Sequence, residues 1–89
     1  MKTAIITHEV KNYSDWRKVY DADEVNRSKA GLHISGVYRS VKNPNVITLI
    51  GEAPSEEALA KFMADPKLKT AMEQGGVISV PEVMILNKL

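Results

Sequence analysis

At the centre of the chain lies Val46-Ile47-Thr48-Leu49-Ile50-Gly51-Glu52, a run of β-branched and aliphatic residues that predicts a strand. The turn before it is Asn43-Pro44-Asn45, in which proline fixes φ and the asparagines bond their own backbone. A second apolar run, residues 32–41, precedes that turn. Because a short turn joins two strand-like runs, we expect them to pair as a hairpin.

Helical patterns flank the hairpin on both sides. Before it, aromatic and aliphatic residues recur at three- and four-residue steps over residues 13–20. Asn12 or Ser14 is expected to cap the start of that helix, and Gly31 is expected to end it. After it, Ser55 is the predicted N-cap of a second helix. Asp65-Pro66 is expected to stop this helix and start it again, with Asp as a cap and Pro at a first helical position.

The order of the elements predicts the fold class. Strands at residues 3–10 and 83–86 complete the order β-α-β-β-α-β. This order is typical of an α+β, ferredoxin-like domain, with a four-stranded antiparallel sheet and two helices on one face. A chain of 89 residues has room for one hydrophobic core, so residues 1–89 are predicted to form a single domain. The runner-up with the same order is an amino-acid-sensing regulatory domain, which associates through sheet edges or helices.

The predicted strands are apolar on both of their faces. Ile5-Ile6, Val46–Ile50 and Val83–Leu86 carry aliphatic residues at adjacent positions, whereas a sheet with one face in water alternates between apolar and polar residues. Two helices cover only one face. We therefore expect a homodimer whose sheets pack face to face as an α/β barrel, or a higher oligomer built on such dimers.

Composition excludes several classes of protein. Twelve Lys and Arg against 11 Asp and Glu leave a net charge of +1, without the basic excess of a nucleic-acid-binding protein. The absence of Cys excludes disulfides, thiolate metal sites and cysteine nucleophiles. No apolar run approaches the roughly 18 residues of a membrane helix, and residues 1–8 turn polar too early for a signal peptide. We expect a cytoplasmic protein that binds neither nucleic acid nor membrane.

The predicted first helix resembles the first-helix signature of the dimeric α/β-barrel superfamily, in the run Tyr13-Ser14-Asp15-Trp16-Arg17-Lys18-Val19-Tyr20-Asp21. The antibiotic-biosynthesis-monooxygenase-like branch is the most similar. The resemblance continues in order through Val37-Tyr38-Arg39, Asn43-Pro44-Asn45-Val46 and Pro81-Glu82-Val83. It implies a pocket within each subunit, between the sheet and the helices.

The resemblance implies a range of activities. The superfamily includes cofactor-independent monooxygenases, polyketide cyclases, lactone isomerases, haem-degrading enzymes and many members of unknown role. Its haem-degrading branch uses an Asn–Trp–His set with the His on the second helix, which this chain lacks because its last His is His33. We expect a cofactor-independent monooxygenase, cyclase or isomerase acting on a small hydrophobic metabolite. The alternative is a non-catalytic protein that binds a small molecule or only assembles.

Two residues are the candidates for catalysis. His8 shares the parity of Ala4, Ile6 and Val10, the more apolar face of the first strand, so its side chain is expected to lie under the helices. A histidine there suits proton abstraction from a phenol or an acidic C–H. Tyr20 has a hydroxyl that can donate to a substrate oxygen. The alternative for His8 is a hydrogen-bonded or exposed histidine at a strand end.

The candidates for substrate binding are an aromatic helix residue, an arginine that could clamp a carboxylate or enolate, and apolar lining residues. These are Trp16, Arg27, Tyr38, Phe62 and Met63. Each has a structural alternative as well. The aromatic and Met side chains could be core, and Arg27 could pair with Asp23 or Glu24 along its own helix.

No metal site is expected. We predict that the second strand runs antiparallel to the first, which brings His8 and His33 to the same end of the sheet. With one strand between them they would lie about 10 Å apart, too far to share a metal ion. No Gly-rich phosphate loop or nucleotide fingerprint occurs either, so no cofactor is expected.

Overall fold

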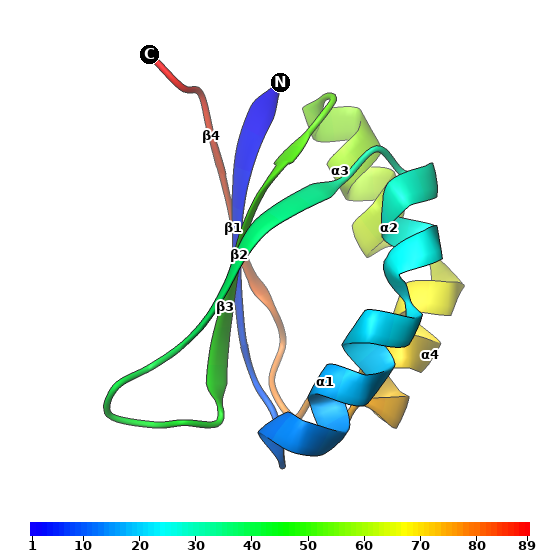
Figure 1. Ribbon diagram of the computed structural model, residues 1–89. Coiled ribbons are helices and arrows are strands. Elements are labelled where there is room, and N and C mark those ends of the chain that lie inside the picture. Colours follow the sequence, from blue (N-terminus) through cyan, green and yellow to red (C-terminus); the bar gives the residue numbers. More distant parts are fainter.

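Four strands pair side by side in the order β2-β3-β1-β4, and the computed structural model describes all 89 residues (Figure 1). The strands are β1 (Lys2–Glu9), β2 (His33–Arg39), β3 (Val46–Ala53) and β4 (Glu82–Leu86). The helices are α1 (Tyr13–Ala22), α2 (Glu24–Lys29), α3 (Glu56–Met63) and α4 (Pro66–Gln74). All the helices lie on one side of the sheet, so the predicted α+β, ferredoxin-like fold is confirmed.

The direction of the strands corrects one expectation. β1 and β2 are each antiparallel to β3, which lies between them, so they run parallel to each other. His8 lies opposite Ile47 near the start of β3, whereas His33 lies opposite Glu52 near its end. The two histidines therefore lie at opposite ends of the sheet. The prediction that they share one end was wrong because only the strand between them reverses direction.

The helix starts follow the predicted capping chemistry. The side chains of Asn12, Ser55 and Asp65 each accept a hydrogen bond from a backbone N–H two or three residues on, at 3.1, 3.1 and 2.8 Å. Gly31 ends the first helical region with a φ of 74°, a left-handed conformation that favours glycine. No helix is long and apolar enough to cross a membrane.

The first helical region is divided at Asp23, which the sequence pattern did not predict. The carbonyl oxygen of Tyr20 accepts hydrogen bonds from the backbone N–H of Asp23 at 3.2 Å and from Nη1 of Arg27 at 2.7 Å. A continuous helix would offer that carbonyl to the N–H of Glu24. The guanidinium takes this place, so α1 and α2 are separate helices and Arg27 is held against the end of α1.

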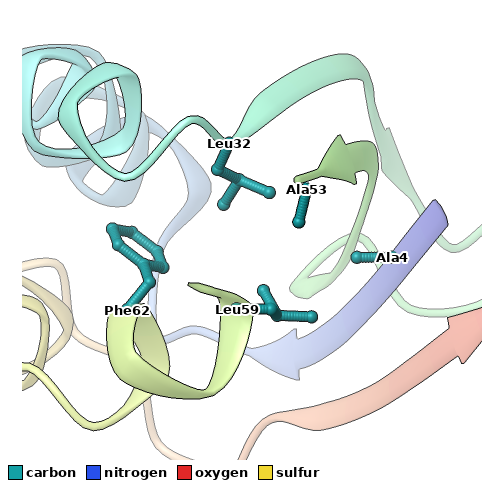
Figure 2. Close-up of a cluster of buried hydrophobic side chains, with 5 residues drawn as sticks. All are labelled: Ala4, Leu32, Ala53, Leu59 and Phe62. Carbon is teal, nitrogen blue, oxygen red and sulfur yellow. The ribbon is translucent and has the colours of Figure 1, made fainter. Parts of the chain in front are cut away.

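Two clusters of buried apolar side chains join the helices to the sheet. In the first, Leu59 and Phe62 of α3 converge with Leu32, Ala53 and Ala4 (Figure 2). The second cluster consists of Ile6, Val10, Trp16, Ile47 and Leu49. The members of these clusters come from the helix-facing side of the sheet, from α1 and α3, and from Val10 and Leu32, which flank β1 and β2.

No helix covers the opposite face of the sheet (Figure 1). The register places on it the side chains of Ile5, Tyr38, Ile50, Met84 and Leu86. Tyr38, Met84 and Leu86 are exposed in the single chain. We call this the outer face, and it carries the aliphatic side chains that the sequence pattern placed there.

Truncation of the first cluster should destabilise the fold. Leu59→Ala removes a side chain that is 2% exposed, and we expect the free energy of unfolding to fall by about 2–5 kcal/mol. Val41→Ala, at a fully exposed position in the β2–β3 turn, should change it by less than about 0.5 kcal/mol. Urea denaturation followed by circular dichroism measures both. Equal effects of the two substitutions would contradict the assignment of the core.

Candidate functional site

A cavity of about 60 Å³ lies between the helices and the sheet. Its wall is mostly apolar, with 12 hydrophobic residues among the 16 that line it. One water needs about 10–15 Å³ of such space, so the cavity has room for a few waters or part of a small ligand. Met63 and Met72 belong to the wall, and flexible Met side chains can shift to admit a larger ring.

Six of the seven predicted site residues line this one cavity. They are His8, Trp16, Tyr20, Arg27, Phe62 and Met63. They come from β1, α1, α2 and α3, which the fold brings together from widely separated parts of the chain.

The seventh, Tyr38, lies on the outer face and is 56% exposed. It pairs with Thr48, whose hydroxyl lies 3.0 Å from the hydroxyl of Thr7 on that same face. A β-bulge between Ile34 and Gly36 inserts one residue into β2, so Ile34 lines the cavity while Tyr38 points the other way. The structure therefore does not place Tyr38 with the other candidates, which corrects its grouping with them.

His8 is a buried polar residue in an apolar wall. The alternation of β1 points it inward with Ala4 and Ile6, and it is 6% exposed. Neither Nδ1 nor Nε2 has a hydrogen-bond partner, and the ring centroid lies 5.6 Å from that of Trp16. Burial lowers the pKa of His8 below its ordinary value of 6.5, because an apolar environment disfavours the charged form. The imidazole is therefore neutral at pH 7 and able to accept a proton.

Trp16 and Tyr20 form an aromatic wall one helical turn apart on α1. Their ring centroids are 4.8 Å apart and their planes differ by 24°. Burial raises the pKa of the Tyr20 hydroxyl above 10, although Arg27 and Arg17 act in the opposite direction. The hydroxyl is therefore protonated at neutral pH and can serve as a hydrogen-bond donor.

Arg27 is a buried cation, 9% exposed, without an acidic partner. No carboxylate oxygen lies within 4.0 Å of its guanidinium, so it does not pair with Asp23 or Glu24 along its helix. Its guanidinium carbon lies 3.7 Å from the centroid of the Tyr20 ring, and Nη1 bonds the Tyr20 carbonyl. The stack and this one hydrogen bond fix the side chain but leave its charge uncompensated.

Other polar side chains of the sheet lie outside this cavity. His33 and Glu52 are exposed, and the guanidinium carbon of Arg39 lies 4.3 Å from the centroid of the Tyr13 ring. No group of three or more His, Asp or Glu side chains is arranged to hold a metal ion.

Several lining residues were not singled out from the sequence. Leu32, Ile34, Leu49 and Pro81 belong to the wall, and Asp23 is its one acidic member. Their apolar character was visible, but their position depends on the pairing of β2 with β3 and on the bulge in β2. For Leu49 the signal was available, since it alternates with the outward-facing residues of β3.

The lowered pKa of His8 predicts a pH-dependent stability. Below about pH 6.5 the unfolded chain binds a proton at this position that the folded chain resists. The contribution of neutral His8 to the free energy of unfolding is therefore fully present above pH 6.5, and it is lost as the pH falls toward the folded-state pKa. We expect a lower melting temperature at about pH 5.5 than at about pH 7.5. His8→Leu should reduce this difference and His33→Gln should preserve it, and an unchanged difference in His8→Leu would contradict the assignment.

Comparison with known proteins supports the fold and leaves the chemistry open. Residues 1–83 match the profile of a family described as a domain of unknown function, DUF3764. A search of curated proteins finds no match. A NIPSNAP-family protein of unknown function from Agrobacterium tumefaciens is 27% identical, with a TM-score of 0.68, and the match covers 97% of this chain and 86% of that one.

Two candidate antibiotic biosynthesis monooxygenases share the fold at lower identity. The protein from Bordetella bronchiseptica is 16% identical, with a TM-score of 0.80, and the match covers 99% of this chain and 96% of that one. The protein from Caulobacter crescentus is 19% identical, with a TM-score of 0.72 and coverage of 99% and 89%. The predicted resemblance to the antibiotic-biosynthesis-monooxygenase-like branch is thus confirmed at the level of the fold.

Proposed function

Because the chain belongs to the DUF3764 family, whose description names no activity, we propose a function from the cavity itself. The cavity binds a small, ring-containing, largely apolar molecule, and His8 removes a proton from that molecule. The observation that carries the proposal is a buried imidazole with both nitrogens unpartnered, facing a cavity. Buried polar groups in folded proteins are almost always hydrogen-bonded. A ligand that bonds His8 would supply the missing partner.

The surroundings of His8 suit a general base. Its lowered pKa keeps the imidazole in the form that accepts a proton at neutral pH. Proton transfer from an acidic C–H or a phenol produces an imidazolium and an enolate or phenolate. The Tyr20 hydroxyl, which is protonated, is available to donate a hydrogen bond to that oxygen. Such an electron-rich anion is the reactive species for oxygenation without a cofactor, and equally for cyclisation or isomerisation.

The apolar walls suit a flat ligand. Trp16 and Tyr20 line the cavity from α1, where the Tyr20 ring stacks with the Trp16 ring and with the Arg27 guanidinium, and Phe62 and Met63 line it from α3. A cavity of about 60 Å³ leaves little room for bulk water once a ring is bound. Exclusion of water protects a reactive anion from reprotonation by solvent.

One observation favours the alternative, binding without turnover. A catalytic histidine commonly has a second group that orients its ring, and no group of the protein forms a hydrogen bond with His8. The Trp16 ring packs against it at 5.6 Å and restricts its motion by contact alone. In this alternative the chain carries or senses the same class of molecule.

A pair of matched histidine variants separates the two functions. Metabolite extract is incubated with wild type, His8→Gln and His33→Gln, and mass spectrometry follows both the free compounds and those retained by the protein. We expect wild type and His33→Gln to consume one compound. His8→Gln should bind that compound but consume it at least about 100-fold more slowly than wild type, because a general base contributes a factor of about 10²–10⁴ to the rate.

Consumption by His8→Gln at the wild-type rate would contradict a catalytic role for His8. Retention of one compound without consumption by any of the three proteins would establish the binding alternative. A protein that neither retains nor consumes any compound would contradict both.

We also propose that the chain is a homodimer, with the outer faces of two sheets packed together. The accessible surface of the single chain is 5913 Å², whereas a folded monomer of this size exposes about 5,200 Å². The excess of about 700 Å² is close to the about 800 Å² that each partner buries in a standard interface. Met84 and Leu86 are 55% and 40% exposed, and they belong to the outer face that the partner would cover.

A charge at the centre of the outer face should prevent this association. Ile50 lies on the central strand β3, opposite Ile5 of β1, so Ile50→Lys would bury an unpaired ammonium between the sheets. In native mass spectrometry at about 10 µM, we expect twice the chain mass for wild type and the single mass for Ile50→Lys. Val25→Lys, on an exposed position of α2, should remain dimeric. A monomeric wild type at this concentration would overturn the proposal.

A further inference from the structure

A second hollow, a polar groove of about 610 Å³, lies between the first helical region and strand β2. Charged and hydroxyl side chains dominate its lining, among them Arg17, Asp21, Glu24, Ser28 and Ser35. It is open to solvent and about tenfold larger than the apolar cavity. Its character therefore differs sharply from that of the cavity beside it.

The groove and the cavity share part of their walls. Tyr20, Arg27, Leu32 and Ile34 line both. Among these four residues, Arg27 is the only charged one. Its guanidinium, stacked 3.7 Å from the Tyr20 ring centroid, therefore lies at the boundary between an apolar and a polar space.

Arg27 forms no ion pair at this boundary. In the groove, Arg17 is paired with Asp21 at 3.0 Å. In the cavity, the carboxylate of Asp23 accepts a hydrogen bond from Asn26 at 2.7 Å and lies beyond 4.0 Å from the guanidinium. Glu24 lines the groove without pairing with Arg27.

The donor capacity of Arg27 is also largely unused. A guanidinium carries five N–H donors, and the one hydrogen bond of this side chain runs from Nη1 to the Tyr20 carbonyl. At 9% exposure the side chain is mostly buried, and its unpaired nitrogens reach solvent only at the groove. A buried cation that lacks both a counter-ion and a full set of acceptors is costly, and an anionic ligand removes that cost.

We propose that the ligand of this site is an amphipathic monoanion, an aromatic or cyclic carboxylate, which enters through the polar groove and places its ring in the cavity and its carboxylate on Arg27. This inference rests on the proposed function and names the class of its ligand. One unpaired cation matches one negative charge, and the planar guanidinium suits two parallel hydrogen bonds to a carboxylate. Arg27 is then the residue that determines specificity for an acid.

The chain provides its own reporter for the test. Trp16 is its only tryptophan, and it lines the cavity, so the single indole N–H signal in a ¹H–¹⁵N spectrum reports occupancy there. Matched probes differ only in charge: benzoate with benzamide, and phenylacetate with phenylacetamide. Titration of each probe into ¹⁵N-labelled protein gives a dissociation constant. For wild type we expect the carboxylates to bind at least about tenfold more tightly than the amides. The reason is that a hydrogen bond between charged groups is stronger than one to a neutral amide.

Two arginine variants complete the test. Arg27→Gln should reduce the ratio of carboxylate affinity to amide affinity to about one, whatever its effect on the affinity for the amides. Arg17→Gln removes the other guanidinium near the Tyr20 ring, 5.5 Å from its centroid, and should keep the preference because Arg17 is already paired and is not part of the cavity wall. The comparison of carboxylates with amides in the wild type needs no variant. If Arg27→Gln does not fold, Arg27→Lys takes its place, and we expect it to show an intermediate preference for carboxylates over amides.

The outcomes separate this inference from the proposed function. Equal affinity of carboxylates and amides, with the Trp16 signal shifting for both, would overturn the monoanion and leave the cavity as a binding site for a neutral ring. A preference that survives in Arg27→Gln would overturn the role of Arg27. No shift of the Trp16 signal with any probe up to the solubility limit would overturn both the inference and the proposed binding function.

Discussion

The sheet of this protein has two apolar faces and helices for only one of them. Along β1, Ala4, Ile6 and His8 point toward the helices while Ile5 and Thr7 point away from them. Four short helices cover the first set (Figure 1). The apolar cavity and the exposed outer face both follow from this arrangement. The covered side holds the cavity, where the helices do not fill all the space above the sheet, and the other side is the outer face.

The covered side is not optimised for stability alone. A stable core would place apolar side chains at His8 and Arg27, since each brings a polar group into a poorly hydrated wall. Neither group is compensated by the protein in the usual way: His8 has no hydrogen-bond partner, and Arg27 has no carboxylate. Violations of this kind are expected at functional sites, where the ligand supplies what the fold leaves out.

Local chemistry was predictable from the sequence, and geometry between strands was not. The caps at Asn12, Ser55 and Asp65 were readable because each depends on neighbouring residues alone. The inward direction of His8 followed from strict alternation in β1, which contains no irregularity. The direction of Tyr38 could not be found in this way, because a bulge between two other residues of β2 shifts the parity of everything after it.

The break at Asp23 was invisible for a related reason. Neither Gly nor Pro marks it, and what accompanies it is a long-range contact: the side chain of Arg27, four residues beyond the break, bonds the Tyr20 carbonyl. Propensity rules describe backbone preference and do not include such a contact. The pairing of Arg27 with Asp23 or Glu24, expected from helical spacing, is absent for the same reason: the guanidinium turns back toward Tyr20 instead of along α2.

A single ligand can meet the needs of both His8, which lacks a hydrogen-bond partner, and Arg27, which lacks an acidic partner. In the empty cavity, burial keeps His8 neutral, which is the state a base needs before the reaction. An anion bound on Arg27 would neutralise the positive charge at the boundary of the cavity. A nearby positive charge disfavours the protonated imidazole, so a ligand that neutralises Arg27 would make His8 a stronger base. A neutral ligand offers no such coupling, and the boundary position of Arg27 would then have no physical explanation beyond the interruption of the helix.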